Sequence, residues 1–288
     1  MKKFKIGIVG VGMVGGALKR YFESEGKTLF LYDKYKNIGS PEAINKAEII
    51  FICVPTPFNR KKGVDLSEIE EAFKAIRGGK VIVLKSTATP GTTEKFQRKY
   101  PKHRILSNPE FLSEATADED MRRPDIQIIG YTAKSRPLAK NILGLLPRAP
   151  FEKILPSAEA EMIKYFHNVH GAVKVIFANQ MYEICQASKV NYDLVKECTA
   201  KSKHILTDIY LNVWHGRYRG YGGSCFPKDI RTLIHFGNKK GVNLALLETV
   251  EKINNQLMKK QKISDPEKLG INKNRINNYR VKNRINPR

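Results

Sequence analysis

A glycine-rich turn near the N-terminus constrains the fold more than any other feature of this sequence. An apolar run at residues 3–10 (KFKIGIVG) leads directly into residues 10–15 (GVGMVG), which have the pattern G-x-G-x-x-G. Such a run is typical of a strand buried on both faces of a parallel sheet. The three glycines allow a tight turn, close approach of a pyrophosphate, and close packing of helix on strand. The segment therefore predicts the first strand, turn and helix of a dinucleotide-binding domain.

The next predicted strand, residues 28–33, ends at Asp33, 18 positions beyond the last glycine of the turn. A carboxylate at this point accepts hydrogen bonds from a ribose 2′,3′-diol and repels a 2′-phosphate, so it favours NAD over NADP. The adjacent Lys34 is the one residue here that would weaken this preference. We predict cofactor contacts at Gly10, Val11, Gly12, Met13, Val14, Gly15, Asp33 and Lys34.

Apolar runs and helical patterns then alternate through the first half of the chain. The further runs lie at residues 48–55, 80–87, 104–107 and 126–131. In residues 65–77 (DLSEIEEAFKAIR), apolar side chains recur at helical spacing. This alternation predicts an α/β domain, a Rossmann-type doubly wound sheet with ligands at the carboxyl ends of its strands.

The second half is predicted to be an all-helical domain with a long connecting helix. Residues 158–188 contain no proline, and their apolar residues recur every three or four positions, which predicts one long helix or two joined near Gly171. Lys164 and Asn168 are four positions apart and therefore share a helical face. Further helical patterns cover residues 193–200 and 243–259.

A second glycine-rich segment, residues 220–229 (GYGGSCFPKD), holds a candidate nucleophile. Its three glycines let the backbone approach a ligand closely. Cys225 comes at the turn into an apparent helix, and a helix N-terminus stabilises a thiolate. Lys228 and Asp229 follow one turn later. An inert, buried cysteine is the alternative interpretation of Cys225.

Charge is the unusual quantity in the composition. The 288 residues carry 51 Lys and Arg against 28 Asp and Glu, a formal charge of +23. Ten of the basic residues and two of the acidic ones lie in residues 259–288, which predicts a flexible basic tail. No basic cluster is interleaved with aromatic residues, so nucleic acid is disfavoured as a partner, leaving a solvated basic surface or one suited to phosphate-bearing small ligands.

Cysteine spacing and hydropathy exclude other classes of protein. The four cysteines contain no C-x-x-C pair, which argues against a zinc ribbon or a dithiol redox motif, and we predict no metal site. No window approaches 18 uninterrupted apolar residues, and the N-terminal apolar stretch runs into glycines rather than a cleavage site. We expect a cytoplasmic protein that does not act at a membrane.

Six segments, in order along the chain, resemble the UDP-glucose/GDP-mannose dehydrogenase family. They are GVGMVG at 10–15, VPTPF at 54–58, STATPGTT at 86–93, NPEFLSEATADED at 108–120, EMIKYFHN at 161–168 and GYGGSCFPKD at 220–229. The resemblance covers residues 1 to about 260. It implies NAD-dependent oxidation of the primary alcohol of a nucleotide sugar, foremost UDP-glucose to UDP-glucuronate, in two hydride transfers through a cysteine thioester.

The resemblance also implies roles for individual residues. Cys225 matches the family's nucleophile, and Lys164 and Asn168 match the residues that hold the oxyanions of both steps. Glu110 and Asp229 match carboxylates that transfer protons and activate water, with either one as base in a given step, and Thr87 would position the water. Implied cofactor contacts are Pro55, Thr56, Ser86, Thr87, Glu114 and Lys228. Implied substrate contacts are Glu110, Phe111, Leu112, Lys164, Asn168, Gly220 and Cys225.

The expected organisation is an NAD-binding domain at residues 1–157, a helical dimerisation and catalytic domain at 158–262, and the flexible basic tail at 263–288. The resemblance implies a homodimer. Family members usually continue into a further domain that holds the nucleotide, so the chain is expected to be a truncated member.

Three hypotheses about activity follow from that expectation. The first is a compact enzyme whose own basic residues, such as Arg217, Arg219 or the tail, hold the diphosphate. The second is a subunit completed by a separate substrate-binding partner. The third is an NAD-binding relic or regulatory module without turnover. A β-hydroxyacid dehydrogenase is the nearest enzyme alternative, but it would not use the Cys225 motif.

Overall fold

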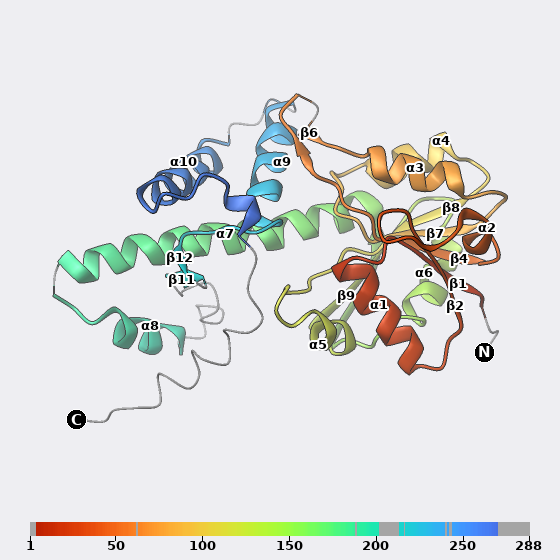
Figure 1. The fold of residues 1–288 in the computed structure, drawn as a ribbon, viewed down its shortest axis with the longest axis horizontal. Helices are drawn as coiled ribbons and strands as arrows, with labels where there is room; N and C mark the ends of the chain where they lie inside the picture. The colour runs from red at the N-terminus through yellow and green to blue at the C-terminus, as the bar shows by residue number, and fades with distance from the viewer. Residues whose placement is uncertain are drawn as a thin grey trace. The chain divides into compact units, whose positions relative to one another are not determined.

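The structure is a computed structural model that describes residues 4–61, 63–187, 189–201, 213–215, 217–239, 241 and 244–269. The chain forms two compact units, Met1–Lys164 and Tyr165–Arg288. We call them the first and the second unit. Figure 1 shows the sheet of the first unit and the long helix that continues into the second.

The first unit is built on an eight-stranded sheet with the order β10-β9-β8-β7-β4-β1-β2-β3. Its strands are β1 (Ile6–Val9), β2 (Leu29–Asp33), β3 (Ile38–Gly39), β4 (Ile49–Ile52), β7 (Val81–Leu84), β8 (Arg104–Ser107), β9 (Ile126–Tyr131) and β10 (Phe151–Pro156). Five neighbouring pairs are parallel, whereas β2–β3 and β8–β9 are antiparallel. The predicted doubly wound sheet is confirmed, and it is mixed rather than wholly parallel.

Helices cover both faces of this sheet (Figure 1). On one face lie α1 (Met13–Ser24), α5 (Ala117–Arg122) and α6 (Ala139–Leu143), and on the other α2 (Pro41–Ile44), α3 (Ser67–Ala75) and α4 (Thr92–Lys99). Successive residues of β4 point to opposite faces: Ile49 and Phe51 join the core under α1, and Ile50 and Ile52 join the core under α3. This double burial explains the continuous apolar strand sequences.

The remaining elements of the first unit are short. They are the antiparallel pair β5 (Phe58–Asn59) and β6 (Gly63–Val64), and the 3₁₀ turn η1 (Arg136–Leu138). The strand order reverses at β1, which lies between β2 and β4. In open α/β sheets, ligands bind at the carboxyl ends of the strands beside such a reversal. The topology therefore predicts a ligand-binding site beside the segments that follow β1, β2 and β4.

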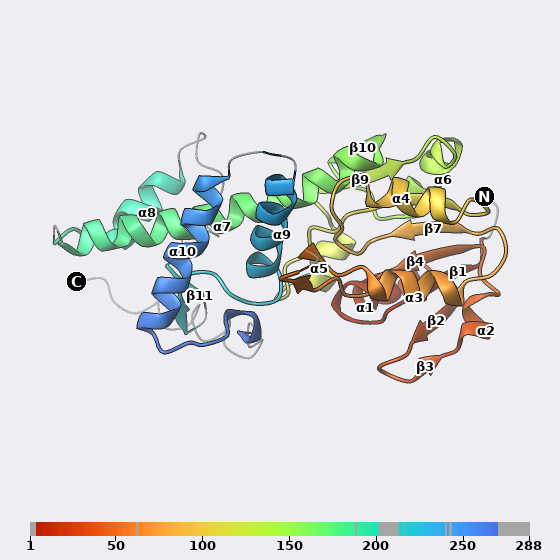
Figure 2. The ribbon, with the colours of Figure 1, turned by 90° about the horizontal axis from the view of Figure 1, so that it is seen from above.

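The second unit is mainly helical (Figure 2). Its elements are α7 (Ser157–Ala187), which begins in the first unit, α8 (Tyr192–Ala200), α9 (Phe226–Lys239), α10 (Ala245–Lys260), η3 (Pro266–Lys268) and the antiparallel strands β11 (Trp214–His215) and β12 (Tyr218–Arg219). Val175 of α7, Ile230 of α9 and Val250 of α10 share one hydrophobic core. The sequence predicts either one helix or two over residues 158–188. The structure has the single helix α7, which continues across Gly171.

Part of the predicted tail, at Pro266 and Glu267, packs against earlier residues of the second unit. The backbone N–H of Gly223 donates to the carbonyl of Pro266 at 2.8 Å, and Arg231 pairs with Glu267. Residues 270–288 lie outside the described residues. Within the described part of the chain, no helix is both long enough and apolar enough to span a membrane.

Candidate active site

The glycine turn joins β1 to α1 through contacts that two of its glycines make possible. Gly10 has a φ of +85°, and a Cβ at Gly15 would lie 1.9 Å from the carbonyl oxygen of Gly10. A Cβ at Gly12, in contrast, would meet no atom within 4 Å. Gly10 and Gly15 are therefore required by the packing of the chain itself, whereas Gly12 leaves an open surface at the start of α1.

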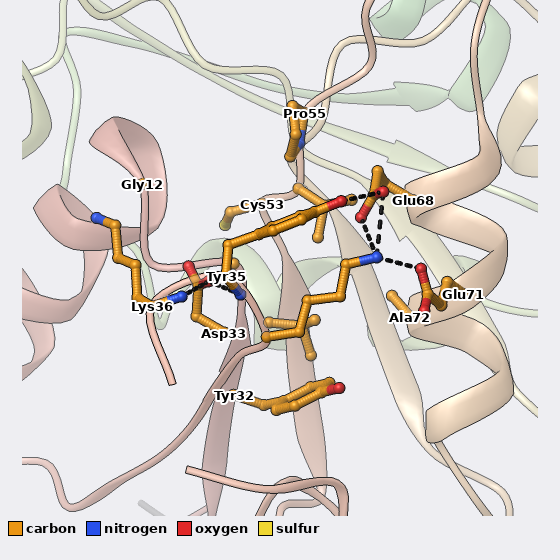
Figure 3. A pocket seen from close by; sticks show the side chains of 14 residues that line it. Gly12, Tyr32, Asp33, Tyr35, Lys36, Cys53, Pro55, Glu68, Glu71 and Ala72 are labelled. Atoms are coloured by element: carbon orange, nitrogen blue, oxygen red, sulfur yellow. Dashed lines mark hydrogen bonds and ion pairs between the residues drawn. The ribbon is translucent and has the colours of Figure 1, made fainter. Parts of the chain in front are cut away.

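A cavity of about 220 Å³ lies beside this turn, at the carboxyl ends of β1, β2 and β4 (Figure 3). Five predicted cofactor residues line it: Gly10, Gly12, Asp33, Lys34 and Pro55. The other residues that line the cavity were not predicted from the sequence. They are Val9, Tyr32, Tyr35, Lys36, Cys53, Val54, Glu68, Glu71 and Ala72. The only available signal for the two glutamates was their spacing on one face of the predicted helix.

Backbone donors fix the carboxylate of Asp33. Its Oδ2 accepts from the N–H of Val11 at 2.7 Å, and its Oδ1 accepts from the N–H groups of Tyr35 and Lys36 at 3.0 Å each. A carboxylate offers about four acceptor positions, so capacity for a further donor remains. Asp33 is buried, with 8% of its surface exposed.

This arrangement fits the adenosine and pyrophosphate portions of NAD. No side chain caps the N-terminus of α1, and its first turn contains no acidic residue. Its backbone N–H groups can therefore receive a pyrophosphate at the open surface of Gly12. The fixed carboxylate of Asp33 can receive ribose hydroxyls.

The other predicted cofactor residues of the first unit do not line this cavity. The hydroxyl of Thr56 donates to the carbonyl of Thr87 at 2.6 Å, and the hydroxyl of Ser86 donates to the carbonyl of Val54 at 2.6 Å. These bonds tie the segment after β7 to the segment after β4. Also outside the wall are Val11, Met13, Val14, Gly15 and the exposed Glu114.

Lys164 and Glu110 form a buried ion pair in the first unit. The Nζ of Lys164 lies 2.8 Å from Oε1 of Glu110, and the two side chains are 5% and 8% exposed. Burial alone would raise the pKa of Glu110, but the charge and hydrogen bond of Lys164 hold that pKa below its usual value. The N–H of Leu112 donates to Oε2 of Glu110 at 2.7 Å, and the ring of Phe111 lies 5.7 Å from Lys164 Nζ. Four predicted residues thus meet here.

A second buried ammonium, Lys85, was missed by the sequence analysis. Its Nζ donates to Oδ1 of Asn108 at 2.7 Å, and Asn108 Nδ2 donates to Oε1 of Gln127 at 2.8 Å. Burial lowers the pKa of Lys85, while its charge helps to lower the pKa of Glu110. Two lysines, not one, therefore stabilise the ionised form of Glu110.

Glu161 joins α7 to the N-terminus of α4. Its Oε2 accepts from the N–H of Gly91 at 2.6 Å, and its Oε1 accepts from the N–H and hydroxyl of Thr93 at 2.8 and 2.6 Å. Burial raises the pKa of Glu161 to about 7, although these hydrogen bonds act in the opposite direction. A second cavity of about 10 Å³, lined by Thr87, Lys164 and Glu161 among others, brings two predicted catalytic residues together.

The remaining predicted catalytic residues belong to the second unit. Cys225 is half-buried and directly precedes α9, and its carbonyl accepts from the N–H of Asp229 at 2.8 Å. Asp229 is only 1% exposed. Its Oδ2 accepts from Nδ2 of Asn168, and its Oδ1 lies 2.5 Å from Nζ of Lys228. Asn168 and Asp229 thus contact each other through their side chains, and the backbone of the first turn of α9 joins Cys225 to Asp229.

The glycines before Cys225 serve partly to contact the chain itself. A Cβ at Gly220 would lie 2.6 Å from Oδ1 of Asn254, and one at Gly222 would lie 2.9 Å from the carbonyl of Pro266. Asn254 also holds Tyr221 through two hydrogen bonds. These contacts explain the glycines without a ligand, so a substrate contact at Gly220 stays a prediction.

Comparison with known proteins identifies similar families and relatives for both units of the chain. Residues 34–143 match the NAD-binding domain model of the UDP-glucose/GDP-mannose dehydrogenase family, and residues 158–256 match its central domain model. Two curated relatives are UDP-glucose 6-dehydrogenases. That of Pseudomonas aeruginosa is 34% identical over 227 residues, covering 73% of this chain and 49% of the relative. TuaD of Bacillus subtilis is 34% identical over 245 residues, covering 80% and 50%. The chain spans about half the length of these relatives.

Solved structures show the same fold. The UDP-glucose dehydrogenase of the archaeon Pyrobaculum islandicum matches with a TM-score of 0.78 and 27% identity, covering 91% of this chain and 72% of that one. A GDP-mannose dehydrogenase from Pseudomonas aeruginosa matches with a TM-score of 0.62 and 25% identity, covering 89% and 69%. Both similarities extend over the NAD-binding and helical units alike.

Two glycine-to-alanine substitutions in the turn are expected to separate packing from ligand binding. Gly15→Ala drives a Cβ into the backbone of Gly10 and should lower the free energy of unfolding by roughly 1–3 kcal/mol or more. Gly12→Ala meets no atom and should leave stability within about 1 kcal/mol of the wild type. It should nevertheless weaken NAD binding, because its methyl group occupies the surface that a pyrophosphate approaches. Urea unfolding and calorimetric NAD titration measure the two effects; equal NAD affinity in Gly12→Ala and wild type would contradict this placement.

Proposed function

The chain belongs to the UDP-glucose/GDP-mannose dehydrogenase family, and from this premise we propose that it oxidises the primary alcohol of a nucleotide sugar to a carboxylate. UDP-glucose is the proposed substrate, because the curated relatives described above carry that activity in their names. One observation carries the proposal. Cys225 stands directly before α9, and the buried Asp229 lies one turn later, bonded to Asn168.

The first oxidation needs a proton acceptor and a stabiliser of developing alkoxide charge. NAD, when bound, accepts the hydride. The ammonium of Lys164 suits the alkoxide, and its ion pair with Glu110 fixes its position. Glu110 itself, held ionised by Lys164 and Lys85, can receive a proton directly or through water. The products of this step are an aldehyde, a proton and a transferred hydride.

The second oxidation needs a nucleophile to add to the aldehyde first. Only the resulting tetrahedral carbon bears a hydroxyl group and can lose another hydride. The thiolate of Cys225 adds to the carbonyl carbon and forms a C–S bond, giving a thiohemiacetal. Loss of the hydroxyl proton and of a second hydride, which a second NAD would accept, leaves a thioester. Water then attacks the thioester, breaks the C–S bond and releases the carboxylate and the thiol. The amide of Asn168 suits the oxyanions of these steps.

Asp229 is the proposed group for the hydrolytic step. It is almost fully buried, and Asn168 and Lys228 hold its two oxygens. Lys228 would act in this step through Asp229, and the cofactor contact that the resemblance implies for Lys228 stays a prediction. Thr87 remains the proposed residue for positioning water, supported by its place beside Lys164 in the small cavity of the first unit.

The stoichiometry of NADH tests the thioester route. Wild-type protein should release two NADH for each UDP-glucose consumed, as measured by absorbance against residual sugar. Cys225→Ser should reduce the rate at least about a hundredfold, because it removes the nucleophile. Cys198, which is exposed, provides the matched control, and Cys198→Ser should keep the wild-type rate. One NADH per sugar, or equal losses in the two variants, would contradict the route, and no turnover across nucleotide sugars would favour a binding module.

We also propose that α7 forms a homodimer interface. Phe166 and Phe177 are 72% and 53% exposed, and they are eleven positions apart, which is about three helical turns, so they share a face. Phe166 also stacks with His170 at a centroid distance of 6.2 Å. Exposed aromatic side chains aligned in this way favour a protein interface over solvent.

Light scattering after size exclusion tests this interface. The wild type should have the mass of a dimer, and Phe166→Asp combined with Phe177→Asp should have that of a monomer, since carboxylates in an apolar interface lose hydration without a partner. Leu246→Asp is a control on α10 with a comparably exposed apolar side chain, 67%. A monomeric wild type, or a dimer that survives the double substitution, would contradict the proposal.

A further inference from the structure

Two lysines beside Asp33 pose a problem of cofactor selectivity. Asp33 favours a ribose with a 2′-hydroxyl, yet Lys34 and Lys36 directly follow it, and ammonium groups at this position are suited to a 2′-phosphate. From the sequence alone, these two lysines weaken the preference for NAD over NADP that Asp33 indicates. The cavity of the first unit shows what each ammonium contacts.

Lys34 is held by two carboxylates of α3. Its Nζ lies 3.0 Å from Oε2 of Glu68 and 3.2 Å from Oε1, and it also bonds Oε2 of Glu71 (Figure 3). The hydrogen bonds of Glu71 and then of Glu68 raise the pKa of Lys34. The ammonium is therefore fully charged, and its charge is directed at α3.

Tyr35 completes this arrangement. Its hydroxyl donates to Oε1 of Glu68 at 2.7 Å, and its ring lies 4.6 Å from Nζ of Lys34. Figure 3 shows the hydroxyl of Tyr35 bonded to Glu68, the same glutamate that pairs with Lys34. Glu68 is thus fixed by two donors, and the lysine is fixed from two directions.

Lys36 is engaged elsewhere. Its Nζ donates to the carbonyl of Val11, in the glycine turn, at 2.6 Å. The ionisable groups that line the cavity are then three carboxylates, Asp33, Glu68 and Glu71, against two ammonium groups. The lining carries a net negative charge, although the chain as a whole carries +23. A dianionic 2′-phosphate would meet a negative lining in which both ammonium groups of the described residues, those of Lys34 and Lys36, already have partners.

We propose that Glu68 and Glu71 are specificity-determining residues, which make the cavity select the 2′-hydroxyl cofactor by holding Lys34 and by supplying negative charge. They lie three positions apart on α3 and therefore share a face. Both pairs lie at the partly exposed wall of the cavity, so their loss should change cofactor selectivity more than folding. Glutamine is as good a helix former as glutamate, so Glu→Gln variants of α3 should fold.

Calorimetric binding of two small probes to the whole chain tests the inference without any turnover. The probes are 5′-AMP and 2′,5′-ADP, which differ only in the 2′-phosphate. Wild-type protein should bind 5′-AMP more tightly than 2′,5′-ADP. In Glu68→Gln combined with Glu71→Gln, affinity for 2′,5′-ADP relative to 5′-AMP should rise about tenfold or more, because Lys34 is released and two negative charges are removed.

Two controls make this test specific. Glu70→Gln removes one negative charge from the same helix, but Glu70 pairs with Lys99 outside the cavity, so its ratio should match the wild type while that of Glu71→Gln alone rises. Adding Lys34→Gln to the double variant should remove most of the gain. An unchanged ratio in the double variant, an equal rise in Glu70→Gln, or no 5′-AMP binding by wild-type protein would overturn the inference.

Discussion

The first unit depends on the contact between the start of α1 and the backbone that follows β1. A Cβ at Gly15 would lie 1.9 Å from the carbonyl oxygen of Gly10 and 3.2 Å from the Cβ of Cys53, so helix and strands meet with no room for a side chain. This close packing brings the N–H groups of α1 to the carboxyl ends of β1 and β4, where the strand order reverses. The bond from Val11 to Asp33 then fixes the end of β2 against the same turn. The cavity is the space that these three strand ends leave open.

The lysine ammonium groups of the two candidate sites bind carboxylates or backbone carbonyl groups of the chain. Lys164 pairs with Glu110, Lys34 with Glu68 and Glu71, and Lys36 bonds Val11. A buried pair such as Lys164–Glu110 adds little net stability, because both ions lose hydration, but removing one partner leaves a costly unpaired charge. The high net charge is thus compatible with a cavity that carries negative charge. The sequence shows the positions of the basic residues, but it does not show which group each of them contacts.

The sequence predicts the parts of the fold whose side chains are buried on both faces. The runs at residues 104–107 and 126–131 coincide with β8 and β9, and the start of α9 directly after Cys225 was expected from its glycine-rich approach. β3 and β10 were missed, because β3 has two residues and β10 is an edge strand with alternating exposed positions. Edge and connecting elements depend on neighbours that come from elsewhere in the chain.

The same limit applies to the candidate site. Residues in recognisable motifs, such as Gly12, Asp33 and Lys164, were predicted, and the structure places them in cavities or ion pairs. Lys85 and Glu68 were missed because only tertiary packing brings a buried lysine to Asn108 or a helical glutamate to Lys34. A local pattern specifies residue type and spacing, whereas the partner of a charge is set by the sheet order.

Peptide mass spectrometry can detect the proposed thioester between Cys225 and the substrate. The wild-type chain would be mixed with NAD and UDP-glucose, quenched with acid during turnover, digested and analysed for the peptide that contains Cys225. We expect a uronyl adduct on that peptide, which hydroxylamine removes as the hydroxamate and which does not form without NAD. Turnover to the carboxylate with unmodified Cys225 throughout, or with the adduct on another residue, would contradict it.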